Sequence, residues 1–170
     1  MNYTDVSVKN FKKVLIANRG EIAVRIMKTA KRLGLETVAV YTEADNGSPH
    51  VNFADKSICI GDGPVIDSYL SAEKIISAAH RTGSDAIHPG YGFLSENHKF
   101  ASLCRKENLT FVGPSAKAIQ LMANKAKAKK IAIEAGVPCI PGFDLEGLVS
   151  KEIEKKVSNI GFPVMIKAAA

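Results

Sequence analysis

The sequence is poor in the features that mark secreted, membrane-spanning and metal-binding proteins. It has no tryptophan and only three cysteines, which are widely spaced and form no C-x-x-C pair. An odd cysteine count argues against a disulfide framework, so we expect all three as buried, reduced side chains. No apolar run is long enough to span a bilayer, and no histidines have metal-ligand spacing such as H-E-x-x-H. We therefore predict no membrane partner and no metal-ligating residues.

The first residues also lack a targeting signal. Residues 1–8 contain no basic region followed by an apolar core, and they lack the Arg-rich, acid-free character of a transit peptide. From these absences we expect a cytoplasmic protein. A length of 170 residues gives room for one ordinary domain.

The net charge of +6 is confined to the amino-terminal part of the chain. Residues 1–35 carry eight Lys or Arg and two acids, and the remainder is balanced. A basic segment of this kind can bind nucleic acid, but the charges are not interleaved with aromatic residues and no nucleic-acid motif is present. We therefore expect no nucleic-acid partner and interpret the charge as a solvated face or a subunit contact.

A strand, a tight turn and a helix near the amino end organise the chain. Residues 14–16 are a short apolar run, as expected of a strand buried on both faces of a parallel sheet. Residues 18–20 tolerate a sharp turn. Apolar residues then recur at helical spacing over 22–33, and Gly34 is placed to end the helix. A second β-rich segment, 37–42, completes a βαβ unit.

Strands and helices continue to alternate up to about residue 113. We expect strands at 56–60, 86–88 and 110–113 and helices at 71–82 and 96–108. This alternation predicts an α/β fold with a Rossmann-like, open, mainly parallel sheet and helices on both faces.

The character of the chain changes after the last of these strands. We expect Ser95 to cap the helix at 96–108. Pro114 and Ser115 are expected to begin a short helix after the strand at 110–113. The remaining sequence predicts a lysine-rich helix at 124–136 and an extended linker at 137–142. It then predicts another helix at 151–160 and a strand at 162–167. We therefore divide the chain into a Rossmann-like domain, 1–114, and a helical connection into the start of another domain, 115–170.

The pattern alone gives few ligand-binding candidates. The first turn has only Gly20, so the G-x-G-x-x-G pattern of NAD and FAD sites is missing and a structural βαβ unit is favoured. Lys125 and Lys167 are candidate phosphate ligands, since a positioned lysine can neutralise a polyphosphate. Lys125 stands among other lysines, which leaves a solvated helix face as the alternative, whereas Lys167 ends an apolar strand.

Three further residues invite a functional interpretation but favour a structural one. His88 ends a predicted strand, and we expect a structural histidine that makes its hydrogen bonds in the core or in a turn. Tyr91 and Phe93 lie in a glycine-rich turn, where we expect them to pack.

Several segments together resemble the biotin carboxylase family in their order and spacing. They are IANRGEIAVR at 16–25, AIHPGYGFLSEN at 86–97 and FPVMIKA at 162–168, with FVGPS at 111–115 and AGVP at 135–138. The resemblance covers nearly the whole chain from about residue 11, and its most specific part is 88–97.

The resemblance implies an ATP-grasp enzyme whose Rossmann-like preATP-grasp domain comes first. Such an enzyme uses ATP with Mg²⁺ or Mn²⁺ to convert bicarbonate into carboxyphosphate, then carboxylates biotin on a carrier protein or domain for a carboxyltransferase component. It also implies that Lys125 and Lys167 bind ATP. The family's glycine-rich lid, metal-binding glutamates and bicarbonate and biotin residues come later, so we expect no catalytic residue here and an inactive fragment.

The resemblance also implies a homodimer contact through the first helix, at Arg25, Lys28 and Arg32. Since the three side chains are all basic, their acidic partners would have to come from elsewhere. Two alternatives stay open: a non-catalytic assembly module, and another ATP-grasp ligase such as a carbamoyl-phosphate synthase. The final acceptor also stays open among acetyl-, propionyl- and methylcrotonyl-CoA, pyruvate and urea, as does the choice between a separate subunit and a multidomain parent.

Overall fold

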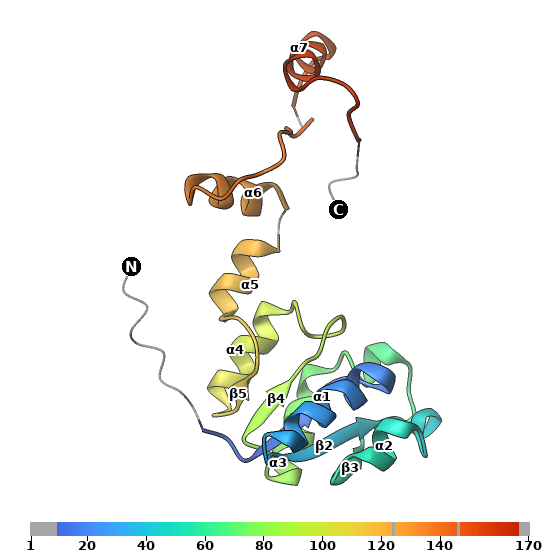
Figure 1. The fold of residues 1–170 in the computed structure, drawn as a ribbon. Helices are drawn as coiled ribbons and strands as arrows, with labels where there is room; N and C mark the ends of the chain where they lie inside the picture. The colour runs from blue at the N-terminus through green and yellow to red at the C-terminus, as the bar shows by residue number, and fades with distance from the viewer. Residues whose placement is uncertain (1–9, 124, 146, 167–170) are drawn as a thin grey trace. The chain divides into compact units, whose positions relative to one another are not determined.

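The computed structural model describes residues 10–123, 125–145 and 147–166 (Figure 1). The chain divides into two compact units, Met1–Gln120 and Leu121–Ala170. The first unit contains a β-sheet covered by helices. The described part of the second contains helices and extended segments.

A five-stranded parallel sheet with the strand order β3-β2-β1-β4-β5 forms the centre of the first unit. Its strands are β1 (Lys13–Ile16), β2 (Glu36–Tyr41), β3 (Lys56–Cys59), β4 (Ala86–His88) and β5 (Thr110–Phe111). The register places Leu15 beside Val38 and beside Ile87. The predicted Rossmann-like parallel sheet is thereby confirmed. Because the chain proceeds outward in one direction from β1 and in the other from β4, the switch point of the topology lies between these two strands.

Helices cover both faces of the sheet, as predicted. On one face α1 (Gly20–Arg32) packs on β1 and β2, with Phe53 of α2 (Pro49–Phe53) beside it. On the other face α3 (Ala72–Thr82) and α4 (His98–Lys106) enclose the larger core. Two 3₁₀ turns complete this unit, η1 (Glu43–Asp45) and η2 (Val65–Asp67).

The helix α1 forms for the reasons that its sequence indicates. Ala23, Met27 and Ala30 are buried at helical spacing and make the stripe that faces the sheet. Gly34 adopts a left-handed φ of 75°, and the Leu35 amide bonds back to the Ala30 carbonyl oxygen at 3.0 Å. This is the C-terminal turn that glycine permits after a helix.

One local prediction for the first unit is corrected. The cap of α4 is Asn97, whose Oδ1 accepts from the amides of Lys99 and Phe100 at 3.0 Å, so Ser95 is not the cap. The segment after β2 contains η1 and the start of α2, since Pro49 at the first helical position suits helix initiation.

The cysteine prediction holds only in part. Cys104 is buried, whereas Cys59 and Cys139 are half-buried. Cys59 lies at the last position of the edge strand β3, where its Sγ meets Glu43 Oε1 at 3.3 Å. An edge strand is covered less completely than a central one, which explains the exposure.

The second unit is described by α6 (Lys125–Glu134) and α7 (Ser150–Ile160), and α5 (Ala116–Met122) leads into it. Residues 137–142, predicted as an extended linker, form no helix or strand and lie within the second unit, and Lys129 Nζ donates to the Gly142 carbonyl oxygen. The strand predicted at 162–167 is not formed over its described residues 162–166. A strand needs a neighbour for its backbone hydrogen bonds, and the described part of this unit offers none.

No helix within the described residues has the length and apolar character needed to cross a membrane.

Candidate functional site

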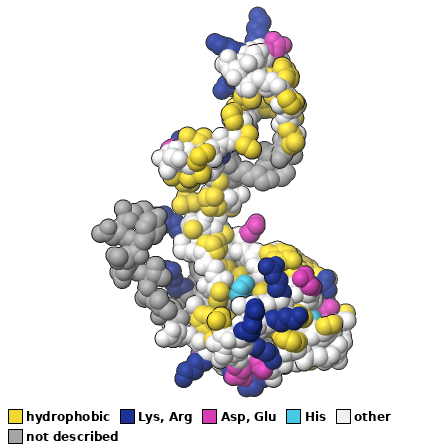
Figure 2. Space-filling view, in the orientation of Figure 1, with side chains coloured by type: hydrophobic (Ala, Val, Ile, Leu, Met, Phe, Trp, Pro, Cys, Tyr) yellow, Lys and Arg dark blue, Asp and Glu magenta, His cyan; other side chains and the backbone are white. Residues whose placement is uncertain are grey.

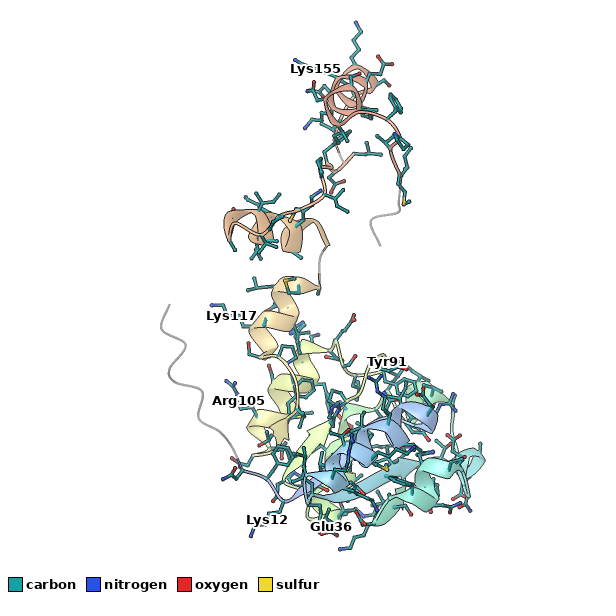
Figure 3. All side chains as sticks on the ribbon, viewed as in Figure 1. Lys12, Glu36, Tyr91, Arg105, Lys117 and Lys155 are labelled. Atoms are coloured by element: carbon teal, nitrogen blue, oxygen red, sulfur yellow. The ribbon has the colours of Figure 1, made fainter. Side chains whose placement is uncertain are left out.

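The carboxyl ends of β1 and β4 lie side by side at the switch point of the sheet. Ile16 pairs with His88 in register, and the Ala17 amide donates to the His88 carbonyl oxygen at 2.9 Å. Open α/β sheets bind their ligands in the crevice outside the strand ends at this point. Figure 3 shows Tyr91, just beyond β4, at the opposite end of the first unit from Lys12 and Glu36.

Asn18 joins the two turns that leave these strands. Its Nδ2 donates to the carbonyl oxygens of Pro89 and Tyr91, both at 2.9 Å, and its Oδ1 accepts from the Arg19 amide at 3.0 Å. The side chain is only 1% exposed. Because both amide protons and the amide oxygen have partners, the position of one turn relative to the other is fixed.

The turn after β4 has an unusual backbone. Gly90 and Gly92 have φ angles of 69° and 68°, and Phe93 has a φ of 43°. A Cβ added to Gly90 would lie 2.7 Å from Asn18 Nδ2. The two glycines therefore meet different needs, since Gly90 allows a close approach as well as a left-handed backbone.

His88 is a turn residue, as predicted. Its Nδ1 accepts from the Gly90 amide at 3.0 Å. Burial lowers the pKa of the His88 imidazole, which favours the neutral ring that this bond requires. His88 therefore helps to shape the turn.

The two aromatic side chains of this turn behave differently. Phe93 packs, with its ring stacked on Tyr69 at a centroid distance of 5.4 Å, as predicted. Tyr91 is 59% exposed, so the prediction that it packs is wrong. The glycines on either side of Tyr91 were the sequence signal for its exposure, because they form a turn that projects from the surface.

A second polar cluster lies beyond the ends of β1 and β2. Tyr69 donates to Asp45 Oδ2 at 2.6 Å, and Arg19 Nη1 lies 3.4 Å from both carboxylate oxygens. Burial of Asp45 alone would raise the pKa of its carboxyl. The hydrogen bonds from Tyr69, Arg19 and the Thr42 hydroxyl outweigh this and lower the pKa. Burial and the neighbouring carboxylate raise the pKa of Tyr69. The cluster holds Arg19, the residue that precedes α1, in one position.

The three basic residues predicted for a subunit contact lie on the exposed side of α1. Arg25, Lys28 and Arg32 are all exposed, and Figure 2 shows basic side chains gathered on this side of the first unit. Arg32 donates to Thr29 Oγ1 at 3.2 Å. None of the three pairs with an acid among the described residues.

An apolar groove of about 470 Å³ runs beside this helix. Its lining comes from α1 and from the ends of β1, β4 and β5, with Tyr91 at the rim: Phe11, Val14, Ile22, Arg25, Ile26, Thr29, Ala30, Leu33, Leu35, His88, Gly90, Tyr91 and Val112. Within the described residues, no side chain fills this groove between α1 and the sheet.

The two predicted nucleotide ligands cannot be placed in the same detail. Lys125 is the first residue of α6, and its side chain lies outside what the structure describes. Lys167 lies outside the described residues altogether. The described residues contain no cluster of three His, Cys, Asp or Glu side chains suited to a metal ion.

The parallel strand order and the helices on both faces define a Rossmann-like α/β domain whose switch point lies between β1 and β4. Residues 10–119 match the family model described as biotin carboxylase, N-terminal domain. The chain belongs to this family, as its sequence motifs predict. Residues 124–170 match the model of the carbamoyl-phosphate synthase L chain, ATP binding domain.

Individual relatives agree with this assignment. Biotin carboxylase 1 of Bacillus subtilis is 54% identical over 94% of this chain, which spans 35% of that protein. The mitochondrial methylcrotonoyl-CoA carboxylase subunit alpha of Dictyostelium discoideum is 52% identical over 96% of this chain, which spans 24% of it. The chain therefore spans about a quarter to a third of the length of these relatives.

A solved structure of similar sequence has the same fold. It is the biotin carboxylase domain dimer of the Hydrogenobacter thermophilus 2-oxoglutarate carboxylase, in complex with MgADP, ADP and bicarbonate. The TM-score is 0.81 at 47% identity, covering 95% of this chain and 35% of that one.

Proposed function

We propose that this chain is the amino-terminal part of a biotin carboxylase. The whole protein would use ATP and bicarbonate to form carboxyphosphate and then carboxylate biotin on a carrier protein, within an acyl-CoA or pyruvate carboxylase. The observation that carries the proposal is the 54% identity to a biotin carboxylase over 94% of the chain. The partners are then a biotin carboxyl carrier and a carboxyltransferase component.

The proposed division of labour places nucleotide binding in the second part of the chain. We assign Lys125 and Lys167 as ATP ligands, because their ammonium groups would neutralise phosphate oxygens that carry the negative charge. The match of 124–170 to an ATP-binding domain model supports this. We place the domain boundary near residue 114, with 115–170 leading into the ATP-grasp domain.

The residues described here do not form a metal centre of their own. Mg²⁺ or Mn²⁺ would accompany the nucleotide and screen its phosphates. No catalytic step is assigned to residues of this chain, and we propose that the 170 residues alone do not turn over ATP.

We also propose a homodimer contact at Arg25, Lys28 and Arg32. The dimer in the similar solved structure supports it, as does the exposure of all three side chains. A symmetric contact of this stripe with itself would bring like charges together, so the opposing acids must lie on another element of the partner.

For the compartment we propose the cytoplasm. The three free thiols support a reducing environment. Relatives from mitochondria define the alternative, and cell fractionation distinguishes the two.

Bicarbonate-dependent ATP hydrolysis with free biotin tests the proposal, on this chain and on the chain extended through its natural continuation. We expect activity only in the extended chain. Lys125→Ala and Lys167→Ala should each raise its KM for ATP by about tenfold, the effect of one lost charge-assisted contact. Lys130→Ala is the matched control, because Lys130 is exposed on α6 and its Nζ lies 4.0 Å from Glu134 Oε1.

Three other outcomes would change the assignment. Turnover by the 170 residues alone would show that the later part of the family sequence is dispensable. An extended chain that dimerises but neither binds nor hydrolyses ATP would favour the assembly module. Hydrolysis that needs bicarbonate but ignores biotin would favour another ATP-grasp ligase, for which the match of residues 124–170 is the supporting observation.

A further inference from the structure

Asn18 ties together two turns at the switch point, and no proposed substrate contact accounts for it. We propose that Asn18 is a positioning residue for the reaction, because its amide holds the turn 89–92 in the place where one substrate other than ATP is bound. This inference rests on the proposed function.

The hydrogen bonds of Asn18 make its amide specific for the task. Two donors are used on the carbonyl oxygens of Pro89 and Tyr91, and the one acceptor is used by the Arg19 amide. The side chain is 1% exposed, so water cannot replace these partners. A residue that only filled the space would not need donors on one side and an acceptor on the other.

The turn that Asn18 holds has a left-handed backbone and approaches Asn18 closely. Gly90, Gly92 and Phe93 all have positive φ angles, and the Gly90 Cα leaves no room for a Cβ beside Asn18 and Ile22. Backbone of this kind persists when its surroundings hold it in place, and it gathers at functional sites. The amide of Asn18 and the Nδ1 of His88 supply that restraint.

The position of the turn identifies the class of ligand. It lies beyond β4 at the switch point, where open sheets bind ligands, and its Tyr91 forms the rim of the groove beside α1. The lysines proposed for ATP belong to the other part of the chain. The turn is therefore left to bicarbonate or biotin, and the measurement below distinguishes the two.

The test is steady-state kinetics on the extended chain with Asn18→Asp. The substitution keeps the shape of the side chain but replaces the NH₂ donor by an oxygen that repels the two carbonyl groups. We expect the KM for bicarbonate or for biotin to rise about tenfold or more, since small displacements at a site have effects of this size. The KM for ATP should stay within about twofold. A loss of folded enzyme lowers the maximal rate but leaves each KM unchanged.

Asn52→Asp is the matched control. Asn52 also donates from its amide to a carbonyl oxygen in a glycine turn, that of Gly47 at 2.9 Å, but it is exposed and lies on α2, which leads into the edge strand β3. Gly90→Ala adds a Cβ that would lie 2.7 Å from Asn18 Nδ2, so it should displace the same turn and reproduce the KM change. It also serves as the second variant where Asn18→Asp does not fold.

The outcomes separate this inference from the proposed function. An active extended chain in which Asn18→Asp and Asn52→Asp have equal, wild-type KM values overturns the positioning role alone. An increase in all three KM values, that for ATP included, overturns it as well, and so does failure of both Asn18→Asp and Gly90→Ala to fold. An inactive wild-type extended chain overturns both proposals.

Discussion

At the residue scale, a few buried polar groups determine the shape of the carboxyl edge. Tyr69 is 1% exposed, and its hydroxyl donates to Asp45 and accepts from the Thr42 amide at 3.3 Å. The Arg19 guanidinium lies 5.7 Å from the centre of the same ring. One side chain therefore links the turn before α1 to the segment after β2.

Removing this hydroxyl should be costly although the change in volume is small. We expect Tyr69→Phe to lower the free energy of unfolding by about 1–3 kcal/mol, because the half-buried Asp45 carboxylate and the buried Thr42 amide each lose a partner. Urea unfolding measures the change. Tyr41→Phe is the control, since the Tyr41 hydroxyl has no hydrogen bond among the described residues. Equal effects of the two substitutions would contradict the prediction.

Asp55 links stability to pH at the other end of α1. Lys31 Nζ at 2.7 Å, with the Thr37 hydroxyl and amide, lowers the pKa of Asp55 to about 2. A carboxyl whose pKa is lower in the folded state stabilises the fold above its unfolded value, and that contribution is lost as the pH falls to the folded value. The window for Asp55 therefore runs from its ordinary pKa of 3.8 down to about 2.

As the pH is lowered through this window, we expect the free energy of unfolding of the wild-type chain to decrease. The free energy of unfolding of the Asp55→Asn variant should decrease less steeply. The difference should be small, because the Asp55 side chain is 40% exposed and solvent screens the pair. Urea unfolding at a series of pH values measures both slopes. Parallel curves for the two proteins would show that Asp55 does not contribute.

At the element scale, α4 depends on a cap that lies two residues after the one its sequence first suggests. Asn97 Oδ1 accepts from two amides of the first turn. We expect Asn97→Ala to lower the free energy of unfolding by about 1 kcal/mol, the usual cost of a lost helix cap. Ser95→Ala should have little effect. Thermal and urea unfolding of both variants measure this, and a larger loss in Ser95→Ala would reverse the assignment.

The same segment shows what local sequence can and cannot predict. The strands and α1 follow from apolar period and flanking glycines, which act over a few residues. The choice between Ser95 and Asn97 depends on where the turn 89–92 ends, and Asn18 fixes that turn from more than 70 positions away in sequence. No local pattern contains this contact.

The missing strand at 162–166 is a different kind of failure. Its apolar run and β-rich composition meet the local criteria for a strand. A strand also needs a neighbouring strand, and the described residues of the second unit provide none. Sequence therefore predicts the preference of this segment, whereas its pairing requires other residues.

At the scale of the whole molecule, the two units differ in how much they bury. All the described hydrophobic side chains that are fully buried belong to the first unit, up to Ile119. In the second unit, α7 has no buried residue, and Ile140 of the linker is 87% exposed. Because burial of apolar surface is the main stabilising term, the stability of the chain should reside in the first unit.

We therefore expect residues 1–120 alone to unfold cooperatively, at the same urea midpoint as all 170 residues. Residues 121–170 alone should show no cooperative transition. Ile119→Ala should lower the midpoint equally in the shorter and the longer chain, with a loss of about 2–4 kcal/mol for a buried isoleucine, and Ile140→Ala should change neither. A lower midpoint for residues 1–120, or an effect of Ile140→Ala on the full chain, would show that the second unit contributes to the stability of the first.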